Sequence, residues 1–358
     1  MNASHLQLAQ EYPPPDEEAD IKRVIELILQ KYKVDFLPGT TALRDAHPKP
    51  HGTVKGEFIV PENLPEKCRY GVFKEARTFP AWIRFSAAFI HPQSDTKRDA
   101  QGMAIKLMGV EGEKLLEEEK DEQTQDFLMA NFNRFFIRNV KQYAALSEAL
   151  LQQDSFVPFF FGGRNPFKWK FKEFWVGMRA IWSRVYNPLH IQYWSQSPYR
   201  LGPHAIKFTA KSRTPQTKRK IPKAEPHFLT EAMVQQLRRE DVYFDFMVQF
   251  QTDPVKMPIE DAWVLWDERL SPFIKVATIR IPKQEFASHE QMQYGEHLSF
   301  APWHALPEHR PLGGLNRARR VAYQTISKLR HQINTRRRKE PNGFEDFESF
   351  KTLSTEKT

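Results

Sequence analysis

The sequence predicts an α+β fold, in which two groups of antiparallel strands and a helical insertion are compatible with a closed eight-stranded β-barrel surrounded by helices. Short β-like runs lie between about residues 54 and 110 and resume after residue 242. Helical periodicity marks the segments at both ends of the chain. The 358 residues are enough to bury a substantial core.

The N-terminal part predicts a flexible arm followed by a helix. Residues 1–15 end in three prolines, and Asp16 can cap the helix that follows because acidic side chains favour a helix N-terminus. Apolar residues then recur at helical spacing and give this helix one apolar face: Ile21, Val24, Ile25, Ile28, Leu29 and Tyr32.

The predicted strands fall into two groups on either side of the insertion. The first group comprises 58–60, 70–73, 82–85 and 103–107, and an acidic loop follows at 111–122. The second group comprises 243–250 and 275–281. In 243–250 every second residue is apolar, which predicts a strand with one buried face.

The insertion, residues 154–200, contains an unusual aromatic and basic segment at 156–186. Phe and Trp alternate there with Lys and Arg, a composition that suits a membrane interface, an oily substrate or a basic amphipathic helix. Two interpretations stay open. The segment is a helical cover over the barrel, or it makes peripheral contact with lipid.

Near the C-terminus, Arg319, Tyr323 and Arg330 are spaced so that a helix places all three on one face. Guanidiniums beside a tyrosine favour its phenolate form, and a phenolate can bind ferric iron. Residues 335–358 follow as a polar, mostly disordered tail.

A second cluster lies far upstream and contains histidines. Arg44, His47 and His51 precede a β-like run, and Arg84 and Ser86 follow it. If a tyrosinate-ligated haem is present, a histidine on its other side could supply the acid and base that peroxide chemistry needs.

These segments together resemble the monofunctional haem catalases, in the shortened form of catalase-related peroxidases. The resemblance rests on four motifs in that family's order: Arg44-x-x-His47, Arg84-Phe85-Ser86, Arg98-Asp99-x-x-Gly102-x-Ala104-x-Lys106 and Arg319-x3-Tyr323-x6-Arg330. Residues 126–138 and 298–303 resemble two further stretches of the family. The resemblance implies the barrel and a haem domain spanning residues 16–334.

The resemblance also implies roles for individual residues. Tyr323 would be the axial ligand of a ferric haem, expected to be haem b, with Arg319 beside it. On the distal side His47, supported by Ser86, and Asn131 would be catalytic, with His51 and Asn133 as alternatives. The remaining cofactor contacts would come from Arg44, Arg84 and Arg330 at the propionates, and from Tyr143, where the family usually has a phenylalanine.

The substrate expected from the resemblance is hydrogen peroxide or an organic hydroperoxide. Ala46 replaces the valine usual before the histidine, a position at which peroxide-disproportionating and lipid-hydroperoxide-converting relatives differ. A fatty-acid hydroperoxide enzyme and a non-catalytic haem-binding protein therefore remain alternatives. The chain lacks the long terminal extensions of large catalases, so a homodimer or another small oligomer is expected.

Composition restricts the other function classes. The net charge of +9 comes with only short basic runs and no nucleic-acid-binding motif, so no nucleic-acid partner is expected. The single cysteine, Cys68, cannot form an intrachain disulfide. Because neither a signal peptide nor a transmembrane segment is evident, we expect a cytoplasmic location.

Overall fold

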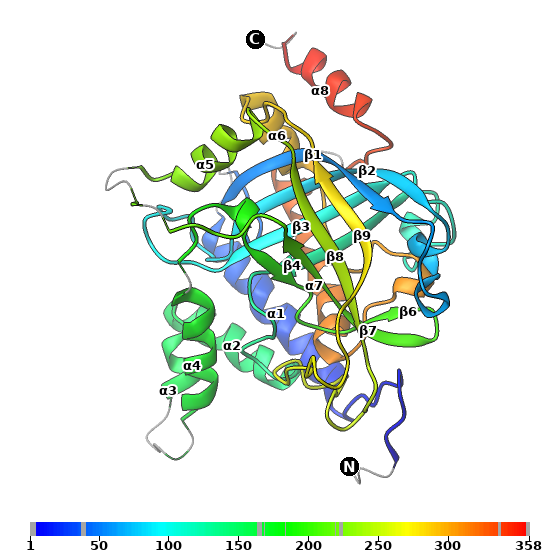
Figure 1. Cartoon of the computed structure of the whole chain (residues 1–358). Coiled ribbons are helices and arrows are strands. Elements are labelled where there is room, and N and C mark those ends of the chain that lie inside the picture. The colour runs from blue at the N-terminus through cyan, green and yellow to red at the C-terminus, as the bar shows by residue number, and fades with distance from the viewer. Residues whose placement is uncertain are drawn as a thin grey trace.

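The computed structural model describes residues 5–36, 41–162, 167, 169–182, 184–218, 220–221, 225–335 and 338–355. Its nine strands form one antiparallel sheet in the order β5-β4-β3-β2-β1-β9-β8-β7-β6. The strands are β1 (Pro50–Val60), β2 (Arg77–Ala87), β3 (Gln101–Met108), β4 (Thr124–Ala130), β5 (Gln192–Trp194), β6 (Tyr199–Leu201), β7 (His204–Ser212), β8 (Val242–Phe250) and β9 (Ile274–Ile281). This order places the two strand groups in a single sheet (Figure 1).

The sheet closes on itself because β5 pairs with both β4 and β7. Eight strands complete the ring, while β6 pairs only with β7 and lies outside it. The predicted closed eight-stranded barrel is therefore confirmed. The closing strand, β5, lies inside the range expected for the helical insertion, in which the last described α-helix ends at Trp182 and a short 3-10 helix follows at Pro188–His190.

The barrel interior is filled by aromatic and aliphatic side chains. The predicted alternation holds on β8, where Phe244, Phe246 and Val248 are fully buried. Rings from four strands meet at the centre, with the centroid of Phe127 5.0 Å from that of Phe246 and 5.3 Å from that of Phe208. A filled interior leaves the outer face of the barrel as the place for a ligand.

Three helices pack together beside the barrel: α1 (Glu17–Asp35), α2 (Val140–Gln153) and α7 (Gly314–Ile333). Their contact is a separate apolar cluster that includes Val24, Ile28, Val140, Ala318 and Ala322. In Figure 1, α1 is blue and α7 is orange, so segments from the two halves of the chain pack together here. The predicted helix after Asp16 corresponds to α1.

The remaining helices are peripheral. They are α3 (Val157–Phe161), α4 (Phe171–Trp182), α5 (Phe228–Leu237), α6 (His289–His297) and α8 (Glu345–Thr355). Helices α3 and α4 project from the barrel (Figure 1). None of the described helices combines the length and the hydrophobicity that crossing a bilayer would require.

One predicted strand is wrong. Residues 70–73 were expected to be extended, but Gly71–Phe73 form a short 3-10 helix. Gly71 has φ +54°, and a Cβ there would lie 2.3 Å from Nε2 of His309, so a glycine is needed. The ring of His309 accepts a hydrogen bond from the backbone N–H of Val72 and fixes this turn.

The C-terminal segment differs from the mostly disordered tail that the sequence predicted. Residues 345–355 form α8, and the buried ring of Phe347 lies 5.9 Å from that of Trp82 on β2. Glu340, which precedes this helix, is 3% exposed and pairs with the ammonium of Lys106. Residues 336–337 and 356–358 of the predicted tail lie outside the described residues.

The N-terminal arm expected at residues 1–15 is described from residue 5 onward. Its backbone is held against the loop before β9, where the N–H of Tyr12 donates to Glu260. Glu11 also pairs with Arg317 at the start of α7 and with Arg310. The described part of the arm thus contacts both the barrel loops and α7.

Candidate functional site

A cavity of about 290 Å³ lies between the outer face of the barrel and helix α7. Its barrel side consists of two rows of residues that are paired across β2, β3 and β4. Arg84 lies beside Ala104 and Leu128 in one row, and Ser86 lies beside Gly102 and Ala130 in the other. Their sequence neighbours Phe85, Ile105 and Phe127 point into the barrel core. The alternation of each strand therefore separates cavity from core.

The helical side of the cavity comes from one face of α7. Residues at spacings of four, four and seven, namely Leu315, Arg319, Tyr323 and Arg330, all line the cavity. The spacing that drew attention in the sequence thus corresponds to one continuous wall.

The phenol of Tyr323 is positioned by a chain of hydrogen bonds. Arg319 donates to the Tyr323 oxygen at 3.2 Å and, with its other terminal nitrogen, to the carboxamide of Asn316 at 3.1 Å. Asn316 is fully buried and donates in turn to the carbonyls of Pro198 and Leu312. The guanidinium is therefore fixed before any ligand binds.

His47 lines the cavity from a strained backbone position. Its φ is +59°, in the left-handed region that non-glycine residues rarely adopt, and such strain concentrates at functional sites. Arg84 donates to the His47 carbonyl at 2.9 Å, and the Ser86 hydroxyl forms a hydrogen bond with Nδ1 at 3.2 Å. A Cβ on Gly102 would lie 2.5 Å from the imidazole, so only glycine lets the ring rest on β3.

The two candidate histidines differ in position. His47 lines the cavity, whereas His51 is fully buried and forms a hydrogen bond with Gln101 at 2.7 Å. Burial, together with the guanidiniums of Arg84 and Arg319, lowers the pKa of His47 to about 3. Its imidazole is neutral at physiological pH and available as a base.

Three arginines of the cavity lining, Arg44, Arg84 and Arg330, contact Glu296. Arg44 forms an ion pair with Glu296, and Arg84 approaches the same carboxylate at 3.3 Å. Arg330 donates to the backbone carbonyl of Glu296 at 2.7 Å. Burial would raise the pKa of Glu296, but the three guanidiniums outweigh that effect and hold the pKa below its usual range. We refer to these four residues as the arginine cluster.

Of the other predicted site residues, Tyr143 on α2 lines the cavity, while Asn131 does not. The carboxamide oxygen of Asn131 instead accepts from the backbone N–H of Gln101 at 2.8 Å. Asn133 is also missing from the described residues that line the cavity. A different carboxamide, that of Gln196, is part of the lining, and its backbone has φ +62°.

Sequence reasoning missed several residues of this site. Asp45 lines the cavity between two predicted site residues, and burial raises its pKa to about 6. Its position next to Arg44 was a usable signal. Glu296 and Gln196 had no local signal, because each reaches the site only through contacts with segments far away in the chain.

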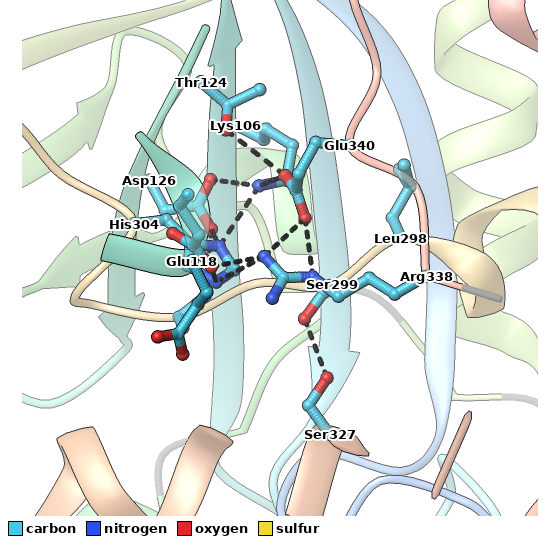
Figure 2. Close-up of polar contacts among 12 residues, drawn as sticks. Lys106, Glu118, Thr124, Asp126, Leu298, Ser299, His304, Ser327, Arg338 and Glu340 are labelled. Atoms are coloured by element: carbon cyan, nitrogen blue, oxygen red, sulfur yellow. Dashed lines mark hydrogen bonds and ion pairs between the residues drawn. The ribbon is translucent and has the colours of Figure 1, made fainter. Parts of the chain in front are cut away.

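A second group of buried charges lies on the next row of the same sheet face, where Trp82, Lys106 and Asp126 are paired across β2, β3 and β4. Figure 2 shows how it is satisfied, with Lys106 bonded to Asp126 at 2.7 Å and to Glu340 at 2.6 Å. His304 lies between carboxylates, 2.9 Å from Asp126 and 2.8 Å from Glu119. We refer to Lys106, Glu119, Asp126, His304, Arg338 and Glu340 as the buried network.

The buried network touches the cavity wall without opening into it. Asp126 accepts from the backbone N–H of Ala301, and Lys106 lies 5.5 Å from the ring centroid of Phe300, which lines the cavity. The neighbouring Ser299 forms a hydrogen bond with Ser327 of α7 at 3.1 Å (Figure 2). The network therefore holds the segment that joins the barrel to α7.

Comparison with known proteins identifies the fold. No family model matches the sequence, and no curated protein matches it. Solved structures with similar folds include catalase A from Saccharomyces cerevisiae, with a TM-score of 0.65 and 17% identity, covering 92% of this chain and 69% of that one.

Two further catalases have similar folds. A fungal catalase has a TM-score of 0.59 and 14% identity, covering 91% of this chain and 64% of that one. A bacterial catalase has a TM-score of 0.58 and 15% identity, with coverages of 82% and 58%. The chain spans about three fifths to two thirds of the length of these proteins. At these identities the likeness shows a catalase-like fold.

Proposed function

We propose that this protein is a haem-dependent enzyme that metabolises peroxides. The observation that carries the proposal is one cavity lined both by the Arg319–Tyr323 pair of α7 and by a neutral histidine, His47, beside the barrel. The catalase-like fold supports the same proposal. A bound ferric haem would supply the redox chemistry that peroxide reduction requires.

The donor set of the cavity fits a haem. The phenol of Tyr323 is an oxygen ligand of the type that holds haem iron in catalases. Four arginines and Asp45 line the cavity, and with Glu296, which pairs with Arg44 and Arg84 from beside the lining, they have a net charge of +2, which matches two propionate groups. Among the described residues none accepts a hydrogen bond from the buried Nε of Arg84, so a donor remains for a carboxylate.

The residues of the chain can handle the proton of a peroxide. A neutral His47 can take a proton from one peroxide oxygen and return it to the other, so that the O–O bond breaks and the second oxygen leaves as water, while the two electrons that this cleavage requires would come from a bound haem. The hydrogen bond with the Ser86 hydroxyl engages Nδ1 and fixes the ring. Nε2 is therefore the nitrogen that can accept the proton of the peroxide. Apolar side chains such as Leu128 and Phe136 limit competing water in the cavity.

The test begins with the cofactor. Purified protein reconstituted with ferric haem should have an absorption spectrum of a tyrosinate-ligated haem, and Tyr323→Phe should lose that spectrum. Tyr143→Phe is the matched control, because this tyrosine also lines the cavity and should leave the axial ligand in place. A spectrum that is the same in wild type and Tyr323→Phe would remove Tyr323 as the ligand.

The second part of the test concerns the reaction. Oxygen release from hydrogen peroxide should fall by about 10²- to 10⁴-fold in His47→Gln, the range that general acid–base catalysis contributes. His51→Gln, which alters a histidine outside the cavity lining, should retain most of the activity. Equal losses in both variants would contradict the assignment of His47.

One observation favours a second candidate substrate, the hydroperoxide of a fatty acid. The cavity lining includes the small, exposed Ala46 and a set of apolar side chains that includes Phe135, Phe136 and Leu146. The same assays with hydrogen peroxide and with a fatty-acid hydroperoxide distinguish the two substrates. If the haem-loaded protein consumes neither peroxide, the remaining function is non-catalytic haem binding.

A further inference from the structure

The projecting segment formed by α3 and α4 concentrates exposed aromatic side chains. Among the described residues, every exposed large aromatic side chain lies between positions 167 and 182. On α4, Phe171, Trp175 and Trp182 are 50%, 53% and 48% exposed. An apolar surface of this kind on a soluble domain usually marks an interaction site.

These aromatic side chains form one stripe on α4. Positions 171, 175 and 182 follow the i, i+4, i+11 spacing of a single helix face, and the rings of Trp175 and Trp182 are 5.7 Å apart. Packing on α3 holds the helix, because Phe174 lies 5.5 Å from Phe160 and Phe171 lies 5.6 Å from Phe161. The rings of Trp175 and Trp182 contact Phe174 and each other within α4, so these two exposed side chains are not needed to hold α4 on the protein.

Positive charge runs along the edge of the stripe. Lys172 and Arg179 are exposed and lie about 100° and 80° around the helix from Phe171 at 100° per residue. No carboxylate of the described residues forms an ion pair with either of them. The one acidic residue of the helix, Glu173, is directed to Arg138 at 3.5 Å. The outer face of α4 is thus aromatic and cationic.

We propose that the α3–α4 segment docks on an anionic lipid surface. Tryptophan and phenylalanine insert at the boundary between headgroups and acyl chains, and lysine and arginine bind anionic headgroups next to them. Charge complementarity selects this partner over a second copy of the chain, because pairing two such faces would bring their cationic edges together. The twelve residues of α4 span about 18 Å, so the helix lies in the interface and does not cross it.

The docking segment adjoins the cavity wall. Phe160 of α3 lies 6.1 Å from the ring of Phe136, and Phe136 lines the cavity. A lipid-docked protein would therefore hold the apolar part of the cavity wall close to the bilayer. The docking proposal stands on surface chemistry alone and does not depend on haem binding or peroxide turnover.

The test is vesicle co-sedimentation of the full chain, without haem and without peroxide. Wild type should sediment with vesicles that contain phosphatidylglycerol. With vesicles of pure phosphatidylcholine it should remain in the supernatant. Two double variants should each weaken vesicle binding at least tenfold: Trp175→Ser/Trp182→Ser and Lys172→Glu/Arg179→Glu. Binding of the wild type should also fall as the salt concentration is raised. Quenching of tryptophan fluorescence by brominated lipid should disappear in the Trp175→Ser/Trp182→Ser variant.

A matched control is available on another exposed part of the surface. Leu270 is 44% exposed, and the Arg269 side chain is 90% exposed, so Arg269→Glu/Leu270→Ser changes the same kinds of residue away from α4. This variant should bind phosphatidylglycerol vesicles as wild type does. Circular dichroism of all variants checks that each is folded.

Three outcomes would overturn the proposal. They are failure of wild type to bind anionic vesicles, binding that is unchanged in both α4 variants, and equal loss in the Arg269→Glu/Leu270→Ser control. A dimer that becomes monomeric in Trp175→Ser/Trp182→Ser, with no vesicle binding by wild type, would assign the stripe to self-association. Since none of these measurements uses haem, they leave the proposed enzymatic function untouched.

Discussion

Arg84 of the arginine cluster and the pair Lys106–Asp126 of the buried network lie on consecutive rows of the same sheet face, yet the two groups differ in charge balance. In the network, the cations Lys106 and Arg338 and the imidazole of His304, whose pKa the carboxylates raise against the effect of burial, meet three carboxylates, so positive and negative groups are closely matched. The arginine cluster has three guanidiniums and one carboxylate. Arg44 and Arg84 pair with the carboxylate of Glu296, Arg330 donates to its backbone carbonyl, and all three arginines line the cavity. A balanced set of charges needs no ligand, whereas an excess of buried positive charge indicates that an anion binds there.

The pKa values follow the same contrast. His304 lies between Asp126 and Glu119, and although burial opposes it, these carboxylates raise the pKa of the imidazole. His47 lies among guanidiniums, and burial with those charges lowers its pKa to about 3. The pKa values of these two histidines are thus shifted in opposite directions, and the lowered pKa keeps His47 neutral and able to accept a proton from a substrate.

The largest expected effect comes from breaking the balanced network. Lys106→Met should lower the free energy of unfolding by about 3–5 kcal/mol, because Asp126 and Glu340 stay buried and lose the ammonium that both of them contact. Urea unfolding followed by circular dichroism measures this change. Lys120→Met is the matched control, since its side chain is 62% exposed and its pair with Glu117 contributes little. A similar loss in both variants would show that the network is not a structural centre.

The two clusters also show what sequence reasoning could and could not predict. The α7 face was predictable, because its three residues lie within twelve positions and helical geometry alone brings them together. The barrel alternation of β8 was predictable for the same local reason. Glu296 and Glu340 were not, because their partners Arg44 and Lys106 are more than 200 positions away, and pairs at such separation are set by the topology.

The same limit explains the wrong strand at 70–73 and the position of Asn131, whose carboxamide is not part of the cavity lining and whose catalytic role stays a prediction. Tyr70–Phe73 has the composition of a strand, but the tertiary contact of Gly71 with His309 overrides that local preference. Asn131 was chosen from its order in the chain, and its carboxamide is taken up by the neighbouring strand end at Gln101. Position in the sequence identified the right wall of the cavity but not which carboxamide faces it.

A smaller effect is expected from the unbalanced cluster, and it should appear in ligand binding and not in folding. Arg84→Met removes one charge from an excess of positive charge, so the free energy of unfolding without haem should change by less than in Lys106→Met. Haem should bind about 10- to 100-fold more weakly, since a charge-assisted hydrogen bond contributes about 1.5–3 kcal/mol. Spectrophotometric titration with haem measures the dissociation constant.

The matched control for this variant is Arg213→Met. Arg213 is a half-exposed residue on the far part of the barrel that pairs with Asp245 and does not line the cavity. Its haem affinity should equal that of wild type. Weaker haem binding in both variants, or a loss of stability in Arg84→Met as large as in Lys106→Met, would remove the distinction between the two clusters.

The smallest expected effect is a pH-dependent one at Asp45. Burial raises the pKa of this cavity carboxyl to about 6, above its usual value near 4, so between those two values the folded protein holds a proton that the unfolded chain releases. Stability contributed by Asp45 is therefore lost as the pH rises from about 4 to about 6 and stays lost above that range. Asp45→Asn should raise the free energy of unfolding by about 1–2 kcal/mol at pH 7.5, with a difference that shrinks toward pH 4.5. Asp126→Asn should instead lower the free energy of unfolding at pH 7.5, because Lys106 and His304 both pair with that carboxylate. If both variants change the free energy of unfolding in the same direction, charge balance does not distinguish the cavity from the buried network.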